Sequence, residues 1–158
     1  MKPLFYKKPL TILVFLIVIL AIAATTMGIF SNDGRGQFEY TSIRGKTVTI
    51  YGKGLYKDMS AEVAPQGIAQ DYVTLFIAIP LLIISFFKAR RGSLKGRYLF
   101  AGTLGYFLVT YLFYTVMGMY NVMFLTYVIL MGASFYSFIL VILSFDTNAL
   151  QNAFKPST

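Results

Sequence analysis

The sequence predicts an all-α membrane protein, a four-helix transmembrane bundle with a small extracytoplasmic β-hairpin or meander between the first and second helices. Only 13% of the 158 residues are charged and 57% are hydrophobic, whereas about 25% of the residues in a soluble domain are charged. The charges lie in short blocks, and the uncharged stretches between them are long enough to cross a bilayer as helices. A solvated surface needs charges along the whole chain, so this pattern excludes an ordinary soluble domain.

The first expected transmembrane helix covers residues 9–30, which contain no charged residue. Residues 10–30 would form a helix of roughly 31 Å, enough to span a hydrocarbon core of about 30 Å. A cleaved signal peptide is the alternative, because the basic segment 1–8 precedes this stretch and residues 21–23 have the small-apolar-small pattern of a cleavage site. Signal peptides have apolar regions of about 7 to 15 residues, so we expect a retained anchor with residues 1–8 in the cytoplasm.

Residues 31–65 are expected to form an extracytoplasmic β-rich segment. Glycines punctuate two short stretches of β-branched and aromatic residues, 37–43 and 47–51, which favours a hairpin or meander that turns near Arg44-Gly45. Acidic and basic residues balance from residue 33 to residue 71. This neutrality is typical of the outer face of a membrane.

The second expected transmembrane helix covers residues 66–87. The uncharged stretch 72–87 would reach only about 24 Å as a helix, so the helix should begin near Pro65 or Gln66 to span the bilayer. Pro80 falls within this span, and we expect it to kink the helix.

A basic loop, residues 88–97, follows with five positive charges and no acidic residue. By the positive-inside rule this short loop faces the cytoplasm, and two spans separate it from the cytoplasmic segment 1–8, so the two assignments agree. The loop has a second interpretation, contact with anionic lipid headgroups, although a role in topology alone is simpler. The residues for such contacts are Lys88, Arg90, Arg91, Lys95 and Arg97.

The long uncharged stretch 98–145 must fold back on itself. It would extend roughly 72 Å as one helix, more than twice the thickness of the hydrocarbon core. A glycine, a tyrosine and an asparagine coincide within residues 118–121, which we expect to form an outer turn between helices 98–117 and 122–145. The polar tail 146–158 then returns to the cytoplasm.

The composition excludes many kinds of chemistry. The chain has no histidine, cysteine or tryptophan, so it lacks the usual metal ligands and the thiol nucleophile. We find no phosphate loop, catalytic carboxylate pair or nucleophile motif. We therefore predict no catalytic residue, no metal, no cofactor and, despite the net charge of +8, no nucleic-acid partner.

Asp71 is the most informative single residue, because a carboxylate at the mouth of a membrane span is expensive unless it faces water, a protein partner or a cation. The predicted topology places it at the same depth as several other polar side chains, so we expect an outward-facing pocket for a cationic or hydrogen-bonding ligand. The simpler alternative is that Asp71 lies in the headgroup layer or favours the positive end of its own helix. The pocket residues would be Asp71, Gln66, Gln70, Tyr114, Tyr120 and Asn121.

Three residues of the third helix, Tyr106, Thr110 and Tyr114, follow one another at spacings of four and form one stripe. We interpret the stripe as a hydrogen-bonded seam between helices. The alternative is a polar path for a substrate.

Several short motifs occur together between residues 66 and 145, and they are Gln66-Gly67, Gln70-Asp71, Pro80-Leu81-Leu82, residues 90–97, Gly105-Tyr106, Tyr120-Asn121, Phe124-Leu125 and Tyr127. In this pattern the chain resembles a family of uncharacterised multipass membrane proteins of bacteria. The resemblance implies a location in the bacterial cell membrane and no defined activity. Family members carry further helices after the part that matches Lys155-Pro156, so the resemblance implies either a short member or part of a longer protein.

Our leading functional hypothesis is a non-enzymatic protein, either sensor-like and ligand-binding or an accessory subunit. Its partner would be another membrane protein or a second copy of the chain. The alternative is a transporter or channel component in which Asp71 and the Tyr106 stripe line the path. The third and fourth spans contain no charged residue and the chain has no inverted repeat, which argues against that alternative.

Overall fold

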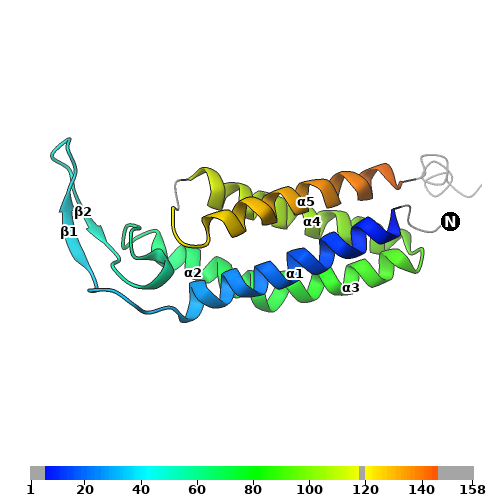
Figure 1. Cartoon of the computed structure of the whole chain (residues 1–158), viewed down its shortest axis with the longest axis horizontal. Coiled ribbons are helices and arrows are strands. Elements are labelled where there is room, and N and C mark those ends of the chain that lie inside the picture. Colours follow the sequence, from blue (N-terminus) through cyan, green and yellow to red (C-terminus); the bar gives the residue numbers. More distant parts are fainter. Residues whose placement is uncertain (1–5, 118–119, 146–158) are drawn as a thin grey trace, which may run out of the picture.

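The computed structural model describes residues 6–117 and 120–145, which form a bundle of long helices with a β-hairpin that projects from one end (Figure 1). The elements in chain order are α1 (Lys7–Phe30), β1 (Phe38–Thr41), β2 (Thr47–Ile50), the 3₁₀ helix η1 (Gly54–Tyr56), α2 (Ala64–Val73), the π-helical turn η2 (Thr74–Ala78), α3 (Ile79–Arg90), α4 (Leu94–Val116) and α5 (Phe124–Leu143). We call the two ends of the bundle the hairpin end and the loop end, the latter containing residues 91–93 between α3 and α4.

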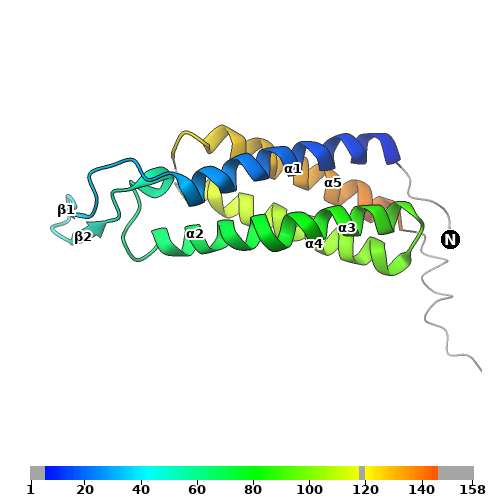
Figure 2. The ribbon, with the colours of Figure 1, turned by 90° about the horizontal axis from the view of Figure 1, so that it is seen from below.

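Four helices in the described part of the chain are long and apolar enough to cross a membrane: Lys7–Phe30, Ala64–Arg90, Leu94–Val116 and Phe124–Leu143. The second of these comprises α2, η2 and α3 as one continuous rod. The rods pack side by side in the order α1, α2 to α3, α4 and α5, and α5 also packs against α1, which closes the bundle (Figures 1 and 2). The predicted helical fold with a small two-stranded sheet is confirmed.

The helices extend further at the loop end than the charge pattern indicated. Only residues 91–93 connect α3 to α4, so most of the expected loop 88–97 is helical. Gly92 has a φ of +86°, which allows the tight reversal, and the Ser93 side chain accepts a hydrogen bond from the backbone N–H of Gly96 at 3.1 Å. This N-cap starts α4 within the basic segment. The expected tail 146–158 and part of the expected turn 118–121 lie outside the described residues.

The expected kink at Pro80 takes the form of a wider helical turn. Proline has no backbone N–H, and its ring clashes with the carbonyl four residues back, here that of Phe76. In η2 the N–H of Ile79 donates instead to the carbonyl of Thr74, five residues back. The π-helical turn lets the rod continue past the proline to the loop end.

The hairpin turns where the sequence indicated. The strands are antiparallel with Phe38 opposite Ile50 and Thr41 opposite Thr47, and Gly45 in the turn has a φ of +76°. The predicted turn near residues 44 and 45 is confirmed.

A glycine-rich stem connects the hairpin to the bundle. The N–H of Gly36 donates to the carbonyl of Gly52 at 3.1 Å, and that of Gly54 donates to the carbonyl of Asp33 at 2.6 Å. A Cβ atom on Gly52 would lie 1.8 Å from the carbonyl oxygen of Gly36, and one on Gly54 would lie 2.2 Å from that of Ser31. These positions require glycine because two backbone segments cross in direct contact.

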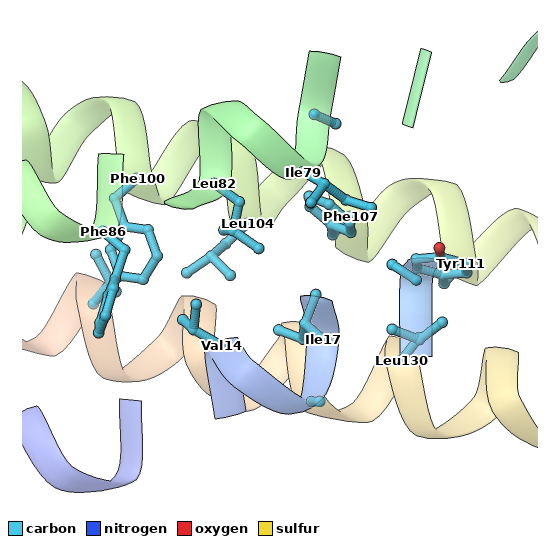
Figure 3. Close-up of a cluster of buried hydrophobic side chains, with 14 of the residues drawn as sticks. Val14, Ile17, Ile79, Leu82, Phe86, Phe100, Leu104, Phe107, Tyr111 and Leu130 are labelled. Carbon is cyan, nitrogen blue, oxygen red and sulfur yellow. The ribbon is translucent and has the colours of Figure 1, made fainter. Parts of the chain in front are cut away.

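An apolar core fills the bundle between the loop end and Tyr111 (Figure 3). Its buried side chains come from every rod and include Val14, Ile17, Ile79, Leu82, Phe86, Phe100, Leu104, Phe107 and Leu130. The outer faces also carry large exposed apolar side chains, such as Ile12, Phe76 and Leu125. A bundle that is apolar inside and outside is compatible with a multipass membrane protein.

Candidate functional site

A buried carboxyl group lies at the hairpin end of the bundle. Asp71 projects from α2 and is only 3% exposed. Tyr56 Oη donates a hydrogen bond to Asp71 Oδ2 at 2.5 Å, and Tyr114 Oη from α4 lies 3.4 Å from Asp71 Oδ1. The two phenol oxygens are 3.3 Å apart. Asp71 therefore joins Tyr56, a residue of the hairpin segment (residues 31–63, between α1 and α2), to the rod that contains α2 and to α4.

Two glycines make room for this cluster. Gly28 of α1 faces the carboxyl group so closely that a Cβ atom there would lie 1.8 Å from Asp71 Oδ2. Gly67, one turn before Asp71, faces the ring of Tyr56, and its Cβ atom would lie 2.7 Å from Tyr56 Cε1. Without these glycines, neither the carboxyl group nor the tyrosine ring would fit between the helices.

The stem brings Tyr56 to this position. The backbone N–H of Leu55 donates to Ser31 Oγ at 2.7 Å, and η1 then turns the Tyr56 ring into the bundle. Leu55, Tyr56 and Ala64 form a small buried cluster of their own, with Met59 and Ile68 packed against it. The sequence reasoning missed Tyr56 and Gly28, for which the only signal was a glycine within an apolar helix, a position that often marks a close approach.

The surroundings of Tyr56 keep its phenol protonated. Burial raises the pKa of Tyr56 above its ordinary value, and the neighbouring Tyr114 and Asp71 raise it further because a phenolate would be repelled by negative charge there. Tyr56 is therefore a permanent hydrogen-bond donor to the carboxyl group at physiological pH.

A second set of hydrogen bonds connects α2 with α4. Gln70 Nε2 donates to Tyr106 Oη at 2.7 Å and to Thr110 Oγ1 at 3.2 Å, and Thr74 Oγ1 lies 2.8 Å from Tyr106 Oη. The predicted seam along the Tyr106 stripe is confirmed. Its third member, Tyr114, belongs to the Asp71 cluster.

Five of the six residues expected in one pocket are divided between two clefts. A cleft of about 480 Å³ between α2 and α4 is lined by Gln66, Gln70 and Tyr114. A cleft of about 800 Å³ between the end of α1, η1 and the start of α5 is lined by Tyr120 and Asn121. Asp71 lines neither of these clefts, because the ring of Tyr56 fills the space next to its carboxyl group.

The remaining pocket residues have separate surroundings. Gln66 is exposed, and its Nε2 donates to the backbone carbonyl of Glu62 at 3.2 Å. Tyr120 is 79% exposed. Asn121 Oδ1 accepts a hydrogen bond from the backbone N–H of Met123 at 2.9 Å, which holds the turn before α5.

Four of the five basic residues are exposed at the loop end, and these are Lys88, Arg90, Arg91 and Lys95. Arg97 differs from the expectation of a headgroup contact, because it is fully buried. Its Nη1 donates to the carbonyl of Ser144 at 2.9 Å, at the end of α5. A cation is favoured at a helix C-terminus by the helix dipole, so Arg97 joins α4 to α5 in this structure.

Within residues 6–117 and 120–145, no group of three or more acidic side chains has a geometry that would hold a metal ion. Comparison with protein-family models, curated proteins and solved structures gives no match for this chain.

Proposed function

We propose that this chain is a non-enzymatic, sensor-like or accessory multipass membrane protein that recognises a ligand or partner through its extracytoplasmic segment and couples that segment to its membrane helices at Asp71. The observation that carries the proposal is the burial of Tyr56, a residue of the hairpin segment, against Asp71 of α2 and Tyr114 of α4. A passive surface loop needs no such connection to the helices.

The orientation follows from charge. The exposed cations Lys88, Arg90, Arg91 and Lys95 cluster at the loop end, whereas the segment at the hairpin end has balanced charges. The positive-inside rule assigns the loop end and both termini to the cytoplasm, and the hairpin to the outside of a bacterial cell membrane.

The connection gives the outer segment a mechanical route into the bundle. The crossing glycines of the stem fix η1 to the end of α1, so a displacement of the hairpin base shifts Tyr56 against Asp71. Asp71 lies in the last turn of α2, three residues before the start of η2 at Thr74, and π-helical turns frequently occur at functional sites. Binding at the hairpin end would in this way change how the rod that contains α2 and α3 packs against α4.

The apolar core argues against the alternative of a transport path through one copy of the chain. Between Tyr111 and the loop end the interior is filled by side chains such as Phe107, Leu104 and Phe100. The buried polar side chains in this described part are scattered over three helices and form no continuous path, and they are Ser85, Arg97, Thr103, Ser134, Ser137 and Ser144. Catalysis is disfavoured because Asp71 is enclosed and its side-chain hydrogen bonds are made with tyrosines.

Single cysteines test the topology, because the chain has none of its own. Ile43 in the hairpin turn is fully exposed, and Arg91 at the loop end is also exposed. A membrane-impermeant maleimide should label Ile43→Cys but not Arg91→Cys in intact cells, and both variants after permeabilisation. Labelling of Arg91→Cys in intact cells would contradict the orientation.

Hydrogen exchange of the purified protein in lipid nanodiscs tests the coupling. Asp71→Asn should raise amide exchange both in residues 51–63 and in α2, because the amide offers a single acceptor oxygen in place of the two that Tyr56 and Tyr114 face. Asp33→Asn is the matched control, since Asp33 is an exposed acid of the same outer segment and lies outside the cluster. If Asp71→Asn raises exchange in α2 alone, the hairpin segment is not coupled through this residue.

A further inference from the structure

We propose that the groove between α2 and α4 holds one acyl chain of a phospholipid of the outer leaflet, and that its mouth selects a headgroup with a primary amine. This inference rests on the proposed membrane location and adds a ligand class and a site to it.

The groove consists of two hollows that join on the surface of the bundle. The first, of about 480 Å³, begins between the residues that follow η1 and the end of α4, and extends along α2. The second, of about 390 Å³, continues along α4. Both are lined by Gln70, Phe113 and Tyr114, which form the junction between them.

The length of the groove fits one leaflet of a bilayer. It starts at Met117 and ends at Tyr106, whose hydroxyl group is held by Gln70 and Thr74. These positions are roughly 16 Å apart along α4, at 1.5 Å per residue. That is about half of a hydrocarbon core of about 30 Å, so the groove matches an acyl chain and not a molecule that crosses the membrane.

The polarity of the groove matches an amphiphile. The mouth carries hydroxyl, amide and carboxyl groups from Ser60, Gln66 and Asp58. Further along, the walls include Val109 and Phe113, which are 50% and 55% exposed. A phospholipid would place its headgroup at the polar mouth and its chain against these apolar side chains.

The charge at the mouth favours an amine. Asp58 is exposed and is the one formally charged side chain among the described residues that line this groove. Its carboxylate attracts an ammonium group and repels an anionic headgroup, while the Ser60 hydroxyl and the Gln66 amide suit the phosphate oxygens. The effect of one charge near the membrane surface corresponds to a preference of about fivefold.

The test uses the full chain in nanodiscs that contain equal amounts of phosphatidylethanolamine and phosphatidylglycerol with the same acyl chains. After extraction in mild detergent, the lipids that stay bound are measured by mass spectrometry. We expect about fivefold more phosphatidylethanolamine, a ratio near one for Asp58→Asn, and no change of the ratio for the control Asp33→Asn, which lines the other cleft. Val109→Trp should fill the groove and reduce the retention of both lipids.

Three results would overturn the inference: equal retention of the two lipids by the unmodified chain, an unchanged ratio in Asp58→Asn, or full retention in Val109→Trp. Efficient disulfide formation between copies of a Val109→Cys variant would also overturn it, because a second copy would then occupy the groove. The two proposals fail separately. A chain that does not fractionate with membranes refutes the proposed function, whereas a chain in the membrane without the lipid preference refutes only this inference.

Discussion

A methyl group added at Gly28 tests the packing around Asp71 most directly. In Gly28→Ala the new Cβ atom would lie 1.8 Å from Asp71 Oδ2, 2.8 Å from Asp71 Cγ and 3.3 Å from Tyr56 Oη. The carboxyl group must therefore move by more than an ångström, which breaks the 2.5 Å hydrogen bond from Tyr56. Leaving the buried Tyr56 hydroxyl without its acceptor costs about 1 to 3 kcal/mol, overpacking costs about 1 to 3 kcal/mol, and the better helix propensity of alanine returns about 1 kcal/mol.

We expect Gly28→Ala to lower the free energy of unfolding by about 2 to 4 kcal/mol. For a chain of this size that is a fall in melting temperature of about 5 to 12 °C, measured by circular dichroism in detergent micelles. The matched control is Gly132→Ala in α5, where a Cβ atom would meet no other atom within 4 Å. In the double variant Gly28→Ala with Asp71→Ala the two costs should be strongly non-additive, because the methyl group then has room. Additive costs, or a Gly28→Ala protein as stable as the Gly132→Ala control, would refute the proposed packing.

Three further predictions concern the stem, the seam and Tyr56. Gly54→Ala should destabilise the hairpin segment by at least about 2 kcal/mol, because φ of residue 54 is positive and the backbone of Ser31 blocks the Cβ atom. The rate of proteolysis within residues 31–63 of the folded protein measures this loss of stability. A rate equal to that of the unmodified protein would contradict the prediction. Gln70→Leu should cost about 1 to 2 kcal/mol, since Tyr106 loses a partly buried hydrogen-bond donor. A melting temperature equal to that of the unmodified protein would count against the seam. Because the pKa of Tyr56 is raised in the folded protein, the contribution of its phenol to stability is complete below the usual tyrosine pKa of about 10 and is lost as the pH rises above that value. The melting temperature should therefore fall more steeply above about pH 10 in the unmodified protein than in Tyr56→Phe. Parallel plots of melting temperature against pH for the two proteins would refute this.

The sequence predicted the helices better than it predicted the loop between α3 and α4. The length of an uncharged stretch shows directly whether it can form a helix long enough to cross a bilayer, so the four long helices followed from composition. The hairpin turn near Gly45 followed from the position of that glycine between two β-branched stretches. The basic residues gave no such information about backbone conformation. Lys95 lies within α4 because Ser93 caps that helix before its apolar part begins, and Lys88 lies in the last turn of α3, where the helix dipole favours a cation.

The candidate site was predictable only in part. The predicted topology placed Asp71 and Tyr114 at the same depth in the membrane, and the structure brings their side chains together. Membrane depth contains no information, however, about which faces of two helices are in contact. Tyr56 was not predicted because an exposed-looking loop gives no sign that one of its rings enters the bundle.

By itself, the sequence determined the class of this protein, the approximate limits of its long helices and the position of its hairpin turn, because each depends on local composition and on distances along the chain. Only the tertiary structure decided that Tyr56 covers Asp71, that Arg97 is buried against the end of α5 and that the expected pocket divides into two clefts. These outcomes depend on how helices rotate and approach one another. Close approach is set by the absence of side chains at positions such as Gly28 and Gly67, whose effect appears only when the opposing surface is present.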